Sequence, residues 1–327
     1  MPAAMPAATT RCEHLQRCLA CVATLLTLTL VPVVSAQGRQ TSSPERIVAI
    51  GDLHGDMLAT RTALRLAGAI DSSDHWIGGK LVVVQTGDLV DRGNDEVAMF
   101  ALFRQLAVEA ARSGGAVKVL NGNHELMQAY FDFRYTTDSG FRSFADTTGI
   151  ESVSDIPDKV KPEQRGRALA FRPGGKMARQ LAARPLILVE GSSVFVHGGV
   201  LPWQAARGID SLNAEASAWL RGEIPQPDWI KGSDKSPVWT RLYSKEPDQA
   251  ACDSARIALN TLGVKRMVVG HSIQKGGIAS YCNGAVWAID VGMSAFSGGK
   301  VQVLEIRGDS VRTLGPVDLH RPKKPRN

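Results

Sequence analysis

Four short glycine-containing motifs constrain the fold of this 327-residue chain more than any other feature. Each follows an apolar, strand-like run and carries side chains that bind metals or protons. The motifs are Gly51-Asp52-Leu53-His54-Gly55, Gly87-Asp88-Leu89-Val90-Asp91-Arg92-Gly93, Gly122-Asn123-His124-Glu125 and His197-Gly198-Gly199. In open α/β sheets, functional residues collect at the carboxyl ends of the strands. The motifs therefore predict an α/β fold with one polar site at the ends of neighbouring strands.

Strand-like runs and amphipathic segments alternate along the first third of the chain. We expect strands at residues 46–50, 80–85 and 117–120, and helices at 56–67 and 94–112. The strand at 80–85 is continuously apolar, which is typical of a strand that is buried on both faces. Because each motif falls once per strand–helix–strand unit, these strands are expected to be parallel.

The rhythm breaks between about residues 130 and 180, a polar and interrupted region. We expect a mostly helical insertion over the site. We interpret its basic cluster as a solvated face without a substrate role, and the alternative is an anion-binding surface before a helix start. The cluster consists of Arg165, Arg167, Arg172, Lys176 and Arg179.

Alternation resumes after the insertion. A hairpin is expected from residues 185–190 and 193–196, and a strand at 266–269 ends in Gly270-His271-Ser272. Helices are expected at residues 211–220 and 248–262. Three short strands with hairpin spacing, which suit a second sheet, are expected at residues 285–289, 300–306 and 310–314.

The first 36 residues have the layout of a secretory signal peptide. Two arginines precede an apolar run over residues 18–34, and Val34-Ser35-Ala36 offers the small residues of a cleavage site. The run is slightly short for a membrane span and lacks a basic stop-transfer flank. We expect cleavage after Ala36 and a secreted or periplasmic protein without a membrane span. A membrane anchor is the alternative if the leader is retained.

The remaining chain divides into a loose start at residues 37–44, a catalytic domain at 45–314 and a Pro-rich tail at 315–327. The formal net charge is +6. Because much of this charge lies in the tail, the folded body is nearly neutral, and nucleic-acid binding is not expected. The cationic residues of the tail are Arg321, Lys323, Lys324 and Arg326.

Two cysteines remain once the leader is removed. Cys252 and Cys282 form an even pair in a protein that is expected to be exported, which indicates one disulfide. Two separate buried thiols are the alternative, since the sequence does not give the Cα separation that a disulfide requires.

The motifs supply the ligands that a pair of divalent metals needs, which are a bridging carboxylate and mixed oxygen and nitrogen donors. Asp52 and His54 are two residues apart and can face one ion, and Asp88 is the natural bridge. Manganese is our first expectation, and iron or zinc are alternatives. The candidate further ligands for the second ion are Asn123, His197 and His271.

In their order, GDLHG, GDLVDRG, GNHE and HGG resemble the signature of the phosphoprotein phosphatase branch of the calcineurin-like metallophosphoesterases. Residues 171–175, 239–241 and 289–293 look like the bacterial-type Shewanella-like phosphatases. The resemblance implies a β-sandwich of two mixed sheets flanked by helices. It implies ligation of one ion by Asp52, His54 and Asp88, and of the other by Asp88, Asn123, His197 and His271.

The resemblance also implies that His124 is the general acid, that Asp91 orients it and that Arg92 grips the phosphate. Elementary chemistry supports the same roles. An imidazole paired with a carboxylate can protonate a leaving oxygen, and a guanidinium fork suits two phosphoryl oxygens. A hydroxide shared by the metals would attack phosphorus in line. Arg241 is the candidate for a second phosphate clamp, with a surface arginine as the alternative.

We therefore expect a metal-dependent phosphomonoesterase that acts on phosphorylated proteins or peptides, through phosphotyrosine, phosphoserine or phosphothreonine. A dinucleoside polyphosphate hydrolase is one alternative, because it shares the metal motifs. The other alternative is a catalytically inactive, metal-bound binding module, which would have no use for an acid and an arginine beside the metals.

Overall fold

The computed structural model describes residues 44–145 and 156–319. The expected leader at residues 1–36, its cleavage site and the end of the basic tail lie outside the described residues. Within the described ranges, none of the helices has the length and apolar character that crossing a membrane requires.

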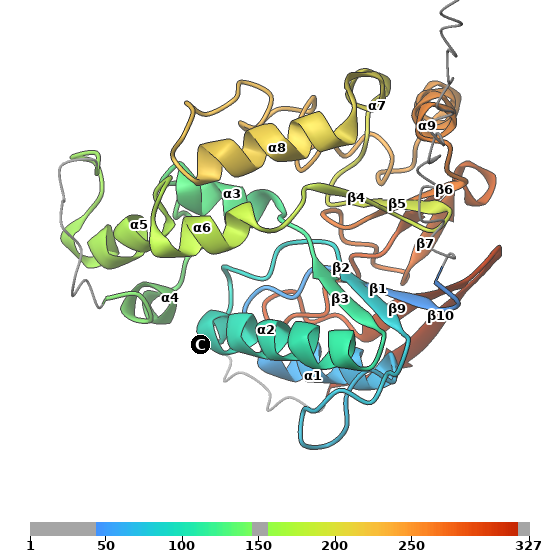
Figure 1. Ribbon diagram of the computed structural model, residues 1–327, viewed down its shortest axis with the longest axis horizontal. Helices are drawn as coiled ribbons and strands as arrows, with labels where there is room; N and C mark the ends of the chain where they lie inside the picture. The colour runs from blue at the N-terminus through green and yellow to red at the C-terminus, as the bar shows by residue number, and fades with distance from the viewer. Residues whose placement is uncertain (1–43, 146–155, 320–327) are drawn as a thin grey trace, which may run out of the picture. The chain divides into compact units, whose positions relative to one another are not determined.

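Two five-stranded mixed sheets form the centre of the fold, and helices flank them (Figure 1). The predicted sandwich of two mixed sheets is confirmed. The first sheet has the order β10-β9-β1-β2-β3, with β1 at Ile47–Ile50, β2 at Val82–Gln85, β3 at Ala116–Val119, β9 at Val301–Arg307 and β10 at Ser310–Val317. The second has the order β4-β5-β6-β8-β7, with β4 at Ile187–Glu190, β5 at Ser193–Val196, β6 at Arg266–Val269, β7 at Ala279–Tyr281 and β8 at Val286–Ala288.

Each sheet contains three neighbouring parallel strands. These are β1, β2 and β3 in the first sheet and β5, β6 and β8 in the second. The other pairings, including the expected β4–β5 hairpin, are antiparallel. The fold thus offers six parallel carboxyl ends, three from each sheet.

Alternate residues of β1 enter different cores. Ile47 and Ala49 pack with Val268 of β6 in the apolar cluster that joins the two sheets. Val48 and Ile50 belong to the larger cluster that includes the helices. All four residues are buried, which explains why this strand is apolar throughout and does not alternate.

Helices pack on both sheets. In the first sheet, α1 at Met57–Leu66 contacts β9 and β10, and α2 at Glu96–Arg112 contacts β3. The carboxylate of Asp56 caps α1 by accepting the N–H of Ala59. In the second sheet, α8 at Ile209–Leu220 contacts β4, and α9 at Gln249–Leu262 contacts β6. A short helix, α7 at Pro202–Arg207, contacts α8 and α9.

The region between the third strand and the hairpin contains short helices. These are α3 at Asn123–Ala129, α4 at Asp138–Arg142, η1 at Pro162–Gln164, α5 at Arg165–Phe171 and α6 at Lys176–Ala182. Helix α5 packs on α3 and α6, and α6 packs on α8 (Figure 1). The expectation of a wholly solvated basic cluster is wrong for one member. Arg165, Lys176 and Arg179 are exposed, but Arg167 is fully buried because α5 turns it toward α3.

The last two strands do not join the second sheet, contrary to expectation. The β9–β10 hairpin pairs with the first sheet, where β9 lies antiparallel beside β1. Spacing within a hairpin predicts that its strands pair with each other, but the sheet edge that they join depends on distant residues. The short strand β7 at the edge of the second sheet was also not predicted.

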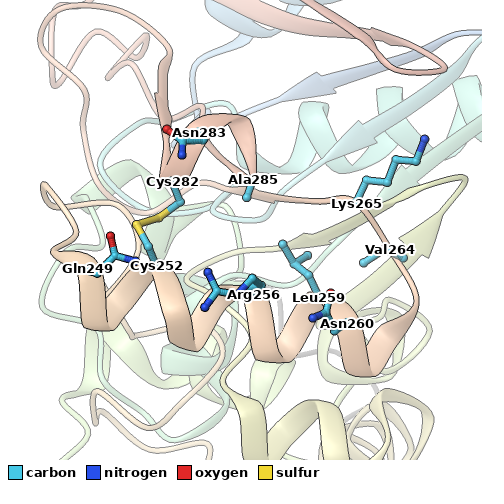
Figure 2. Close-up of a pocket in the computed structure, with 10 residues that line it drawn as sticks. All are labelled: Gln249, Cys252, Arg256, Leu259, Asn260, Val264, Lys265, Cys282, Asn283 and Ala285. Atoms are coloured by element: carbon cyan, nitrogen blue, oxygen red, sulfur yellow. A yellow bond between two sulfur atoms is a disulfide. The ribbon is translucent and has the colours of Figure 1, made fainter.

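The predicted pair of cysteines forms a disulfide. Cys252 lies on α9, Cys282 lies in the short 3₁₀ helix η2 at Cys282–Gly284, and their Cα atoms are 5.3 Å apart. The bond ties α9 to the segment between β7 and β8. It forms part of the wall of a cavity of about 590 Å³, together with Arg256, Leu259 and other residues (Figure 2).

Candidate active site

Polar side chains follow the carboxyl ends of the parallel strands in both sheets. From the first sheet, Asp52 and His54 follow β1, Asp88 follows β2, and Asn123 follows β3. From the second sheet, His197 follows β5 and His271 follows β6. A cavity of about 40 Å³ lies at this place. It is lined by Asp52, Asp88, Arg92, Asn123, His124, Tyr135, Trp239, Arg241 and His271.

Two glycines allow the second and third motifs to touch. A Cβ on Gly87 would lie 2.4 Å from the backbone nitrogen of Gly122, and Gly87 has a positive φ of 100°. A Cβ on Gly122 would lie 2.2 Å from Oδ1 of Asp88. Because only glycine leaves this space, these positions explain why the motifs carry it.

Strained backbone is concentrated in the predicted site residues. Among the described residues, ten besides glycine have positive φ, and five of these are predicted site residues. Such conformations cost free energy and persist where the surrounding structure determines them, often at functional sites. The five are His54, Asp88, Asp91, Arg92 and His271.

Glu125 anchors the loop that carries Asp88. Its buried carboxylate accepts the N–H groups of Asp88 at 2.8 Å, Leu89 at 2.7 Å and Gly122 at 2.7 Å. The sequence analysis quoted Glu125 within its motif but gave it no role. Its position three residues after Gly122, at a helix start, was the available signal, because a glutamate there can cap backbone N–H groups.

Hydrogen bonds turn two imidazoles toward Asp88. His54 bonds through Nδ1 to the carbonyl of Val90 at 3.0 Å, so its Nε2 lies 3.7 Å from Oδ2 of Asp88. His197 bonds through Nδ1 to the carbonyl of Thr86 at 2.9 Å, and its Nε2 lies 3.2 Å from the same oxygen. In both cases the backbone carbonyl fixes which ring nitrogen faces the site.

The other predicted donors complete the cluster. Nε2 of His197 lies 2.8 Å from Oδ1 of Asn123. His271 bonds through Nε2 to the carbonyl of Trp239 at 3.1 Å, which leaves Nδ1 for another partner. Asp88 belongs to both of the candidate metal-binding groups among the described residues. These are Asp88 with His54 and His124, and Asp88 with His197 and His271, with ligand atoms within 4.8 Å of one another.

The donor set fits divalent cations. Burial, together with the charges of Asp290 and Asp88, raises the pKa of Asp52 well above its usual value. Burial lowers the pKa of His197, but Asp88 and Asp52 outweigh it and raise this pKa to about 9. Both shifts reflect excess buried negative charge, which bound cations would neutralise. Burial, aided by the charge of His124, lowers the pKa of His54 to about 3, which keeps its ring in the neutral form that ligates metals.

His124 and Asp91 form a buried pair at the edge of the cavity. Nδ1 of His124 lies 2.7 Å from Oδ2 of Asp91, and Nε2 lies 3.8 Å from Oδ2 of Asp88. Burial lowers the pKa of His124, but Asp88 and the hydrogen bond to Asp91 outweigh it and raise the pKa above its usual value. The ring can therefore hold a proton close to the cavity.

Arg92 lies between two aromatic rings. Its Cζ is 5.3 Å from the ring centroids of both Tyr135 and Phe296. Its Nη1 donates to Nε2 of His54 at 2.8 Å, and Nη2 lies 3.4 Å from Nε2 of His124. Its buried Nε has no hydrogen-bond partner among the described residues. The guanidinium thus faces the cavity with a donor available to a ligand.

Arg241 also lines the cavity. Its Nη1 donates to the carbonyl of His271 at 2.6 Å and to Oγ of Ser272 at 2.9 Å, and the side chain is only partly exposed. These bonds hold the guanidinium beside His271. The structure thus brings all ten predicted site residues together.

Two further features of the site were not predicted. Asp290, which is buried, follows β8 as His271 follows β6, and burial raises its pKa to about 6. Its place directly after an expected strand was the available signal. The aromatic pair of Tyr135 and Phe296 carried no signal, because the two residues lie in separate loops with no motif around them.

Comparisons with known proteins agree with this geometry. Residues 45–275 match the model of the calcineurin-like phosphoesterase family. The chain is 40% identical over 310 residues to Shewanella-like protein phosphatase 2 of Arabidopsis thaliana, a match that covers 85% of this chain and 79% of the relative. It is 30% identical over 179 residues to a symmetrical bis(5'-nucleosyl)-tetraphosphatase of Neisseria gonorrhoeae, covering 54% of this chain and 51% of that protein.

A solved structure shows the same fold. The cold-active protein-tyrosine phosphatase of a psychrophilic Shewanella species superposes on this chain with a TM-score of 0.64 at 24% sequence identity. The match covers 83% of this chain and 80% of that structure.

Proposed function

The chain belongs to the calcineurin-like phosphoesterase family, and from this premise we propose that it is a metal-dependent phosphomonoesterase that acts on phosphorylated proteins or peptides. One observation carries the proposal. The metal-ligand set around Asp88 shares a cavity with an arginine and with His124, which is paired with Asp91. A binding module would need the ligands but not the acid.

We propose two divalent ions, with manganese as the first candidate and iron or zinc as alternatives. When bound, the ions would stabilise phosphoryl charge and activate the attacking water. In this proposal Asp88 bridges the ions, because it belongs to both candidate groups. The remaining ligands are Asp52 and His54 for one ion, and Asn123, His197 and His271 for the other.

The protein's own residues would handle the leaving group and the phosphate. As water bonds to phosphorus and the ester P–O bond breaks, His124 gives the proton on Nε2 to the leaving oxygen. Asp91 holds the opposite ring nitrogen at 2.7 Å and stabilises the protonated ring before transfer. Arg92 offers a planar fork to the phosphoryl oxygens, and Arg241 offers a second cation from the opposite sheet.

The aromatic rings beside Arg92 favour phosphotyrosine among the phosphoprotein substrates. Tyr135 is 40% exposed and Phe296 is 64% exposed, so both rings are open to a ligand. An aryl phosphate whose phosphate contacts Arg92 would place its ring between them, where ring contacts stabilise it. Phosphoserine and phosphothreonine lack a ring and would gain less.

Dinucleoside polyphosphate hydrolysis is the weaker alternative. The relative named for that activity matches about half of each chain, whereas the protein phosphatase relative matches most of both.

Steady-state rates with added manganese on three substrates test the proposal. The substrates are a phosphotyrosine peptide, a phosphothreonine peptide and diadenosine tetraphosphate. Each rate is paired with that of His124→Asn, so that a contaminating phosphatase is recognised because it survives the substitution. We expect peptide turnover that falls in the variant. Turnover of the dinucleotide alone would transfer the assignment to the alternative, and no turnover would favour a binding module.

We also propose that the protein is exported through the leader at residues 1–36. The Cys252–Cys282 disulfide supports this proposal, because structural disulfides persist in oxidising compartments. Amino-terminal sequencing of the protein purified from a secreted or periplasmic fraction should begin at Gln37. A start within the leader would favour the membrane anchor.

A further inference from the structure

The helical region after the third motif places an arginine in the protein interior, next to the acid pair. Arg167 on α5 has 0% exposure and is the largest fully buried side chain among the described residues. The rings of Phe144 and Phe171 lie 5.1 Å and 4.9 Å from its Cζ. Because it is enclosed in this way, Arg167 cannot serve as a surface for anions.

The guanidinium uses its donors on three groups. Nε donates to Oε1 of Gln128 at 2.8 Å, and Nη1 donates to Oε2 of Glu96 at 2.6 Å and to the carbonyl of Gly140 at 3.1 Å. Nη2 donates to Oε1 of Glu96 at 3.2 Å. Helix α5 is thereby tied to α3, which carries Gln128, and to the start of α2, which carries Glu96.

Both side-chain partners of Arg167 hold Asp91. Nε2 of Gln128 donates to Oδ2 of Asp91 at 2.9 Å, and Oε1 of Glu96 accepts the backbone N–H of Asp91 at 2.6 Å. Arginine can only donate, so the amide oxygen of Gln128 must face Arg167 and its NH₂ group must face Asp91. Arg167 thus fixes the direction in which Gln128 donates.

Asp91 needs such support. Its φ of 67° lies in the left-handed region, which a residue with a Cβ adopts only at a cost. Its Oδ2 also meets Nδ1 of His124 at 2.7 Å, and its Oδ1 accepts from Oγ1 of Thr136 at 2.7 Å. Nη2 of Arg167 lies 3.7 Å from that Oδ1.

We propose that Arg167 is a positioning residue that holds Asp91, and through it His124, in the geometry for proton donation. The inference rests on the proposed function of the site. A purely structural role would need no such convergence, since apolar residues often fill a buried ion-pair site with equal or better stability. Here the buried pair is instead built around the group that orients the acid.

Arg167→Lys tests the proposal in the full, manganese-loaded protein. Lysine keeps the charge, but its single ammonium cannot hold Gln128 and Glu96 in one planar fork. Arg165→Lys, an exposed position on the same helix, is the matched control. The substrates are aryl phosphates whose leaving groups range from 4-nitrophenol to phenol.

We expect Arg167→Lys to lower kcat for phenyl phosphate by about 10- to 100-fold, part of what general acid catalysis supplies, and to change 4-nitrophenyl phosphate much less. Arg165→Lys should leave both rates unchanged. In the His124→Asn background, Arg167→Lys should cost nothing further, because the group that it positions is gone. An equal loss across leaving groups, or the same loss without His124, would overturn the proposal.

A spectroscopic measurement separates this inference from the proposed function. The ring N–H proton that His124 shares with Asp91 should give a downfield proton NMR signal, assigned by its absence in His124→Asn. We expect the signal to persist in Arg165→Lys and to shift or vanish in Arg167→Lys. An unchanged signal would overturn the positioning role, whether or not the wild-type protein hydrolyses any ester.

A second variant covers the case in which Arg167→Lys does not fold. The double substitution Glu96→Gln with Arg167→Met removes both charges together and leaves no unpaired ion in the interior. It should show the same loss of the His124 signal and the same dependence on the leaving group. A folded double variant with wild-type behaviour in both measurements would overturn the proposal.

Discussion

The two sheets contribute unequally to the site. The loops of the first sheet carry several functional residues each, including the carboxylates Asp52 and Asp88 and the acid pair of Asp91 and His124. After each of its parallel strands, the second sheet contributes a single one, of which His271 is an example. The first sheet therefore supplies most of the chemistry, and the second supplies the ligands that complete it.

The difference follows from chain connectivity. In the first sheet the parallel strands are joined by compact strand–helix–strand units, and the tight turns concentrate polar residues in short motifs. In the second sheet a long segment with three helices separates β5 from β6, so its ligands lie far apart in the sequence. The comparison predicts that substitutions at Asp88 affect both halves, and that substitutions at His271 affect one.

The largest expected effect is that of Asp88→Asn. Because Asp88 belongs to both candidate groups, losing its charge should remove most bound metal and lower kcat by on the order of 10³-fold or more. Metal content by elemental analysis and steady-state rates check this prediction. Asp132→Asn, an acidic residue outside the cavity, is the control. Normal turnover in Asp88→Asn would contradict the metal assignment.

His271→Asn should separate the halves. It removes a ligand only from the second-sheet side, so metal content should fall from about two ions to about one per chain, and activity should fall by about 100-fold. Titration with manganese, followed by elemental analysis, measures the stoichiometry. If both ions were lost together, the two halves would not be independent.

Phe296→Ala should alter selectivity without altering metal content. Loss of one aromatic wall beside Arg92 should lower kcat/KM for a phosphotyrosine peptide by about 2- to 10-fold, the usual worth of an aromatic contact. The phosphothreonine peptide should be almost unaffected. Ile257→Ala, an exposed apolar residue on α9, is the control. An equal loss on both peptides would exclude a role in side-chain preference.

Glu305→Gln should affect stability alone. Burial raises the pKa of Glu305, but the hydrogen bonds from Arg312 and Arg46 outweigh it and lower the pKa to about 2. A lowered carboxylate pKa stabilises the fold above its unfolded value of about 4.5, and this stability is lost as the pH falls toward 2.

Urea unfolding at pH 6 should therefore show a loss on the order of 1 to 2 kcal/mol in Glu305→Gln, after allowance for the exposed parts of both arginines. The gap between variant and wild type should shrink as the pH falls from about 4.5 toward 2, because the wild-type carboxylate becomes protonated. A gap that is constant with pH would show that the ionised carboxylate is not the source. The rate at pH 7 should not change.

Much of the fold could be predicted because its signals are local. The strands β1, β2 and β3, the β4–β5 hairpin and the helix cap at Asp56 lie within one or two residues of expectation. Strand and helix periodicities, turn residues and caps depend on neighbours a few positions away. The same locality makes the three motifs of the first sheet recognisable, since each turn carries its ligands together.

Only the tertiary structure decided which distant surfaces meet. It placed the β9–β10 hairpin in the first sheet, paired Cys252 with Cys282, and put Tyr135 and Phe296 on opposite sides of Arg92. It also buried Arg167, which a basic segment had led us to expect at the surface. Sequence determines residue types and local spacing, but burial and contact depend on how elements pack across the whole chain, because the free energy of packing is shared among residues far apart in sequence.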